Sequence, residues 1–219
     1  VREYAIECAI LKVFSSEVVQ YTSDEAVQVY GGMGFSAESE VEACYRDARI
    51  SRIYEGTNEI NRLLIVKMVL KKAVTGEIDF FGPAKNVAKE LMSIPSFEEP
   101  SNEIFSEFKV VLKNLKKIIL MVSGTASEKL GIKIGEEQEL MIHISDMIID
   151  TYMLESALLK TEKLTSKEGP IKNQERISMC INFLHSTIDK FQKNGKEAIY
   201  ALSEGDEQKI LLLGLKRFT

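Results

Sequence analysis

One acidic residue in this chain, Glu55, is especially well placed for chemistry because Gly56 and Thr57 follow it. Thr57 suits the N-cap of a helix. A run of apolar residues at helical spacing begins just beyond it, with Ile60, Leu63, Leu64 and Met68. A helix N-terminus favours a phosphate or a developing oxyanion, and a glycine lets a ligand approach the backbone. The pattern fits a catalytic base beside an anion-binding turn; it also fits a solvated loop acid beside an ordinary capped helix.

The chain before this stretch predicts helical structure. Residues 1–30 contain neither glycine nor proline, and their apolar pattern is already running at Tyr4, so we expect the chain to begin inside a helix of a longer protein. The segment forms one long helix, or two with a joint near Thr22, which has capping-box spacing to Glu25. A short helix from about Ser39 to Arg49 should follow, with its charged residues in salt bridges.

A glycine-rich segment, Gly31-Gly32-Met33-Gly34, should end the first helix, because three glycines in four residues cost too much backbone entropy to stay helical. Such a bare turn would let a bulky cofactor lie against the main chain. A simple C-cap followed by a loop is the alternative. No strand precedes the glycines, so they are not a dinucleotide-binding fingerprint.

The second half of the sequence predicts a further helical bundle. Glycine and proline cluster between Thr75 and Asn102, which indicates a linker with a short helix over 84–92. Apolar stripes at helical spacing then recur over 105–122, 140–158 and 177–191, separated by breaks at 124–135 and 166–170. With a last segment over 207–215, this pattern predicts an up-and-down bundle of about four helices.

Composition excludes several classes of function. The chain has 219 residues, 45% of them hydrophobic, which is enough for a real core. A net charge of -5 and a pI near 5.3 argue against nucleic acid as a partner. Cys8, Cys44 and Cys180 are far apart, and His143 and His185 have no ligand-spaced partner, so we expect no disulfide framework and no metal site.

Three segments together resemble the C-terminal helical domain of the acyl-CoA dehydrogenases. They are Gln28-Val-Tyr-Gly31-Gly32-Met-Gly-Phe35, then Tyr45-Arg-Asp-Ala-Arg49, then Ile53-Tyr-Glu-Gly-Thr-Asn-Glu-Ile60, in matching order and spacing. The resemblance covers roughly residues 1–72. It implies an all-α fold, a C-terminal bundle of the catalytic domain followed by a second, smaller up-and-down helical bundle. The implied domains are 1–74, truncated at its start, a linker over 75–102, and an appended bundle over 103–219.

The resemblance also implies roles for individual residues. Glu55 would remove the α-proton of an acyl-CoA thioester while hydride passes from the β-carbon to FAD, and Gly56 would lie against the substrate. Thr57, Asn58 and Glu59 would contact FAD in the same subunit, although Asp or Gln is more usual than Glu at position 59. Gln28, Gly31 and Gly32 would contact the FAD of a dimer partner, so a homodimer is implied.

An appended helical domain is typical of the very-long-chain branch of the family, which implies β-oxidation of long- or very-long-chain acyl-CoA with an electron-transfer flavoprotein as electron acceptor. A catalytically silent assembly scaffold of the same family is the alternative.

We expect a cytoplasmic location in a bacterium, and the mitochondrial matrix or inner-membrane surface in a eukaryote. The predicted linker is rich in apolar residues, which would either touch a membrane surface peripherally or pack between the two bundles. These residues are Phe80, Phe81, Val87, Leu91, Met92, Ile94 and Phe97.

Overall fold

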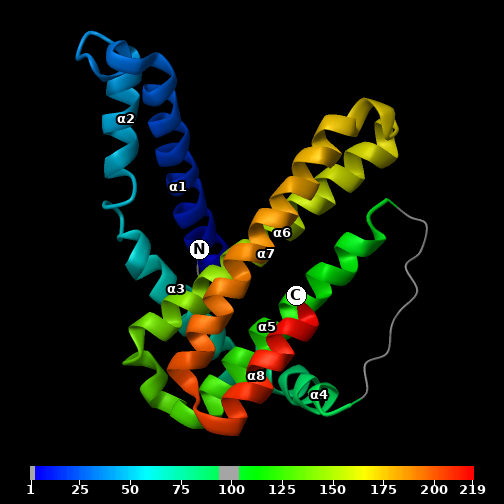
Figure 1. Ribbon diagram of the computed structural model, residues 1–219. Helices are drawn as coiled ribbons and strands as arrows, with labels where there is room; N and C mark the ends of the chain where they lie inside the picture. Colours follow the sequence, from blue (N-terminus) through cyan, green and yellow to red (C-terminus); the bar gives the residue numbers. More distant parts are fainter. Residues whose placement is uncertain (1–2, 94–103) are drawn as a thin grey trace. The chain divides into compact units, whose positions relative to one another are not determined.

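All the regular structure that the computed structural model describes, over residues 3–93 and 104–219, is helical (Figure 1). The predicted all-α fold class is therefore confirmed. The chain divides into two compact units, the first ending at Lys71 and the second beginning at Lys72. Residues 94–102 of the predicted linker, which include Ile94 and Phe97, lie outside the described residues.

The first unit contains α1 (Ala5–Tyr30), α2 (Glu40–Ile50) and most of α3 (Asn58–Val74). No joint interrupts α1 at Thr22, so the structure has one long helix there. α1 and α2 lie side by side (Figure 1). Side chains on one face of each helix are buried, namely Ala9, Ile10 and Val13 of α1, Ala48 of α2, and Leu63, Ile65 and Val66 of α3.

The glycine segment ends α1 as predicted, and a 3₁₀ helix, η1 (Gly31–Phe35), follows. Gly31 has a φ of 58°, a left-handed value that glycine adopts without steric cost. Gly34 is buried, and a Cβ there would lie 2.7 Å from the main-chain oxygen of Val27. Ser39 then caps α2 by accepting a hydrogen bond of 3.3 Å from the Val41 N–H.

The second unit contains α4 (Phe81–Leu91), α5 (Ser106–Leu130), α6 (Gln138–Glu168), α7 (Gln174–Leu202) and α8 (Gly205–Phe218). α6 and α7 form a long antiparallel pair, joined by η3 (Ile171–Asn173), while η2 (Gly131–Gly135) joins α5 to α6 (Figure 1). α5 packs against α6, α7 and α8. The predicted four-helix bundle is thus present, and its core includes Leu115, Met147, Leu154, Phe191 and Leu215.

One predicted break was placed too early, because α5 continues through Gly124 and ends at Leu130. A Cβ at Gly124 would lie 3.2 Å from the Cβ of Ala84 on α4. The glycine therefore allows α4 to approach α5 closely, and packing compensates for its low helix propensity.

α4 lies within the predicted linker and packs against α5 as part of the second unit. Phe80 and Val87 are buried, and the Arg217 guanidinium donates hydrogen bonds of 2.9 and 3.1 Å to the main-chain oxygens of Glu90 and Ser93. Two of the apolar side chains considered for membrane contact are therefore used in packing, while Phe81 and Met92 stay exposed. No helix in the described ranges is both long and apolar enough to cross a membrane.

Candidate functional site

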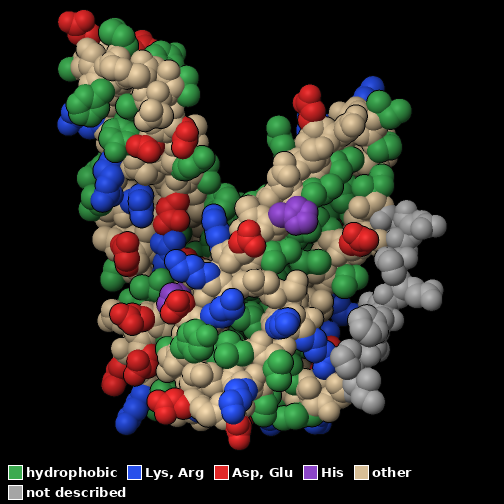
Figure 2. Space-filling model, in the orientation of Figure 1, with side chains coloured by type: hydrophobic (Ala, Val, Ile, Leu, Met, Phe, Trp, Pro, Cys, Tyr) green, Lys and Arg blue, Asp and Glu red, His purple; other side chains and the backbone are tan. Residues whose placement is uncertain are grey.

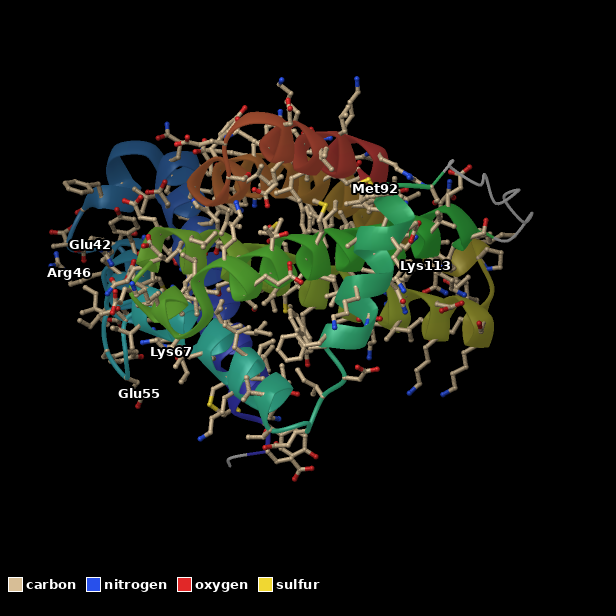
Figure 3. All side chains as sticks on the ribbon, turned by 90° about the horizontal axis from the view of Figure 1, so that it is seen from below. Glu42, Arg46, Glu55, Lys67, Met92 and Lys113 are labelled. Atoms are coloured by element: carbon tan, nitrogen blue, oxygen red, sulfur yellow. The ribbon has the colours of Figure 1, made fainter. Side chains whose placement is uncertain are left out.

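The segment between α2 and α3 carries the predicted base on a sharply bent backbone. Glu55 and Gly56 have φ values of 53° and 81°, so two consecutive residues are left-handed. Such a conformation is natural for Gly56 and unfavourable for Glu55, because a Cβ crowds the backbone there. The Glu55 side chain is exposed and points outward, away from the helices (Figure 3).

The predicted N-cap at Thr57 is confirmed. The Thr57 hydroxyl oxygen accepts a hydrogen bond of 3.2 Å from the Ile60 N–H, and α3 begins at the next residue, Asn58. The N-terminal end of α3 therefore follows Glu55 directly along the chain. The positive end of its dipole favours negative charge near this turn.

Asn58 is the anchor of the turn. It is 0% exposed, and its side-chain amide donates hydrogen bonds to Ser16 Oγ at 2.9 Å and to Glu17 Oε1 at 3.1 Å. Its side-chain oxygen accepts a hydrogen bond of 2.7 Å from Lys12 Nζ. The Asn58 N–H donates to the main-chain oxygen of Arg52 at 3.1 Å. The structure thus places Asn58 behind the turn, fully buried against α1.

Charged groups surround the first turn of α3. Hydrogen bonds from its own main-chain N–H and from the Thr57 hydroxyl lower the pKa of Glu59 below its ordinary value, and Arg62 and Arg52 add smaller effects in the same direction. Glu59 itself is exposed. An ionised carboxylate at a helix N-terminus is also favoured by the helix dipole.

The other predicted cofactor residues form a separate set at the far end of α1. Gln28, Gly31 and Gly32 are all exposed, and nothing lies within 4 Å of where a Cβ would stand at either glycine. Gln28 is eleven residues beyond Glu17 on α1, which at the helical rise corresponds to about 16 Å. The structure therefore brings together residues 55–59 and keeps Gln28, Gly31 and Gly32 apart from them.

A surface cavity of about 530 Å³ lies between α1, η1 and α2. Ile53, the first residue of the third motif segment, lines it together with Phe35 and Tyr45. Arg46 on its edge forms the expected salt bridge, with Glu42 one turn earlier on α2 (Figure 3). Tyr54, the next residue, is exposed.

Sequence reasoning missed the residues of α1 that hold the turn. Lys12, Ser16 and Glu17 bind the Gly56 oxygen or the Asn58 side chain, and Arg62 binds Glu17 with an N–O distance of 2.8 Å. The signal available in the sequence was the polar pair Lys12 and Ser16, four residues apart and therefore on the same face of the helix.

Comparisons with known proteins show which family this chain is similar to. A family model described as "Acyl-CoA dehydrogenase, C-terminal domain" matches residues 2–70, and a second model with the same description matches residues 114–217. The whole chain is 41% identical to a probable acyl-CoA dehydrogenase of Bacillus subtilis, and 88% of it is 31% identical to the mitochondrial very long-chain specific acyl-CoA dehydrogenase of Rattus norvegicus. The chain spans about a third of the length of these relatives, 37% and 32%.

The chain is also similar to a solved structure of an acyl-CoA dehydrogenase. The crystal structure of an acyl-CoA dehydrogenase complexed with FAD from Bacillus anthracis matches 99% of this chain, with a TM-score of 0.95 and 41% sequence identity. The match covers 36% of that chain.

Proposed function

Because this chain belongs to the acyl-CoA dehydrogenase family, we propose that it supplies the C-terminal helical part of an FAD-dependent dehydrogenase that acts in fatty-acid β-oxidation. The reaction converts a long- or very-long-chain acyl-CoA to the trans-2-enoyl-CoA. The single observation that carries the proposal is the exposed carboxylate of Glu55 on a left-handed turn, directly before the N-terminus of α3. The second helical unit and the similarity to the rat very-long-chain enzyme over most of the chain support the preference for long acyl chains.

In this proposal Glu55 is the base that takes the α-proton of the thioester. A carboxylate in water is a weak base toward a carbon acid, so the site must exclude water and polarise the thioester carbonyl. The N–H of Glu55 donates to that carbonyl oxygen, where negative charge develops. Gly56 lies against the substrate because its bare backbone permits close approach.

FAD, when bound, accepts the hydride that leaves the β-carbon. The residues of this chain fit such a group in two places: Thr57 and Glu59 at the exposed start of α3, and the bare backbone of Gly31 and Gly32 with Gln28 beside it. The separation of about 16 Å along α1 supports the assignment of the second set to the cofactor of a dimer partner. Asn58, which has no exposed surface, supports the turn from behind.

The experiment uses the complete dehydrogenase that contains this chain. Purified protein should show the visible absorbance of bound flavin, and anaerobic addition of palmitoyl-CoA should bleach it faster than butyryl-CoA does. A colourless protein, or a bound flavin that no acyl-CoA bleaches, would contradict the proposed enzyme function. It would favour the alternative, a catalytically silent scaffold. Faster bleaching by butyryl-CoA would support the proposed enzyme function but contradict the proposed preference for long acyl chains. An electron-transfer flavoprotein added afterwards should restore the absorbance by accepting the electrons.

A further inference from the structure

The turn that carries Glu55 needs support from outside its own sequence. Glu55 is the only described residue other than glycine with a positive φ, and Gly56 after it is left-handed as well. A strained backbone of this kind persists only where surrounding contacts hold it in place. The neighbouring hydrogen bonds therefore show which groups hold the carboxylate in position.

Lys12, in the N-terminal third of α1, makes the central contacts to this turn. Its ammonium group donates to the main-chain oxygen of Gly56 at 2.8 Å and to Asn58 Oδ1 at 2.7 Å. The Gly56 oxygen accepts a second hydrogen bond of 2.9 Å from the Asn61 side-chain amide. Two donors on different helices thus fix the orientation of the peptide between Gly56 and Thr57.

The lysine is itself part of a fixed arrangement. Asn58, its second acceptor, is fully buried and also donates to Ser16 and Glu17 on the same helix as Lys12. Glu17 is in turn bound by Arg62 from α3. Asn58 and Ser16 are buried members of this network, so a broken hydrogen bond to either would leave a buried polar group unpaired, which favours one geometry.

We infer that Lys12 is a positioning residue for Glu55, which fixes the backbone on which the carboxylate and its N–H are presented to the substrate. The inference rests on the function proposed above and adds a residue to it. Lys12 does not need to touch the acyl chain or the cofactor to act in this way. Three donors on a flexible stem let one ammonium group reach two acceptors on either side of Thr57.

The test compares Lys12→Met, Lys12→Arg and Glu55→Gln in the complete dehydrogenase. Methionine keeps the length and apolar stem of the lysine and removes its donors, whereas arginine keeps donors. Rapid mixing with palmitoyl-CoA gives two separate quantities, the limiting rate of flavin reduction and the concentration for half-saturation. Flavin content, measured by absorbance, reports whether the protein has assembled.

We expect Lys12→Met to keep the wild-type flavin content and the wild-type half-saturating concentration of palmitoyl-CoA. The limiting rate of flavin reduction should fall by about 10-fold or more, because small misplacements of reacting groups cost up to about 10² in rate. Lys12→Arg should recover part of the loss. A wild-type limiting rate in Lys12→Met, or a loss confined to substrate affinity, would overturn the inference. A merely structural role would lower flavin content in proportion to the rate.

The Glu55→Gln variant keeps the two proposals apart. If Glu55→Gln is slow and Lys12→Met is normal, the inference on Lys12 fails and the function stands; if Glu55→Gln is normal, the base is elsewhere and the function itself is revised. Should Lys12→Met fail to fold, Lys12→Gln replaces the ammonium group by a shorter, uncharged polar side chain and tests the same two hydrogen bonds. A slower limiting rate with unchanged half-saturation is then expected, and a wild-type rate would overturn the inference.

Discussion

The hydroxyl oxygen of Thr57 accepts a hydrogen bond of 3.2 Å from the Ile60 N–H, and the same hydroxyl group lowers the pKa of the nearby Glu59 carboxyl. One side chain therefore caps α3 and stabilises the ionised form of a neighbouring acid. The pKa of Glu59 lies below its ordinary value of 4.5 chiefly because its own main-chain N–H stabilises the carboxylate, and the Thr57 hydroxyl adds to this effect.

The first prediction concerns pH. A lowered pKa in the folded state means that the ionised form contributes stability above about pH 4.5, and that this contribution is lost as the pH falls through the lowered value. Thr57→Val should raise the pKa of Glu59 and weaken the cap. Titration of the Glu59 carboxyl carbon by NMR measures the shift, and an unchanged pKa in Thr57→Val would contradict the role given to the hydroxyl.

The second prediction tests the base directly. Glu55→Gln in the complete dehydrogenase should bind FAD and acyl-CoA nearly as well as the wild type but reduce the flavin about 10² times more slowly or worse, because the amide keeps the size and loses the basicity. Glu38→Gln, at an exposed acid elsewhere in the first unit, is the matched control and should reduce at the normal rate.

The third prediction separates two neighbouring glycines. Gly34→Ala should destabilise the chain by ~1–3 kcal/mol, because its Cβ would meet the main-chain oxygen of Val27 at 2.7 Å and the Tyr30 Cβ at 2.8 Å. Gly32→Ala should stay within about 0.5 kcal/mol of the wild type, since nothing lies within 4 Å of its Cβ position. Urea unfolding followed by circular dichroism measures both, and equal stability of the two variants would refute the packing argument.

The fourth prediction concerns the three free cysteines. Cys180 is buried, and burial raises the pKa of its thiol, an effect that a hydrogen bond with Thr161 partly offsets. Cys8 and Cys44 are exposed. Iodoacetamide at pH 7.5 should therefore modify Cys8 and Cys44 at least about 10 times faster than Cys180, as followed by peptide mass spectrometry. In urea the three rates should converge; a fast reaction of Cys180 in the folded chain would show that its helix pair opens readily.

The fifth prediction concerns these 219 residues on their own. Large hydrophobic side chains stay at the surface of the first unit (Figure 2), among them Val18, Val19, Tyr21 and Val29 on α1 and Met33 and Phe35 on η1. Exposed large apolar side chains promote association. We expect the isolated chain to fold, remain colourless after incubation with FAD, and self-associate on gel filtration in a concentration-dependent way. Stoichiometric flavin on a monomer would show that the cofactor site is complete within this chain.

The helices of the bundle were predictable because their buried faces are mostly apolar at helical spacing, as along α5 and α6. The face of α7 was predicted less well. Ile181 is an apolar residue within the predicted stripe over 177–191 but is 42% exposed, whereas Cys180 and Thr187 in the same range are buried. Small and polar residues on a buried face give no apolar signal. The apolar pattern therefore did not identify every buried position of α7.

The site was predictable where its features are local. The cap at Thr57 and the end of α1 at the glycines follow from residue types within a few positions. The orientation of Asn58 did not follow, because a polar side chain beside a cap can point outward to a ligand or inward to another helix. Only the fold shows that it points inward, to Lys12, Ser16 and Glu17.

The contacts between α1 and the turn also determine when the site can form during folding. The hydrogen bonds from Lys12 join residues 44 and 46 positions apart in sequence, so they require closure of a long loop. Helices such as α1 and α3 form from local contacts alone, on a much shorter timescale than such closures between distant segments. The bent backbone at Glu55 is therefore a late product of folding, completed only when α1 has docked against the start of α3.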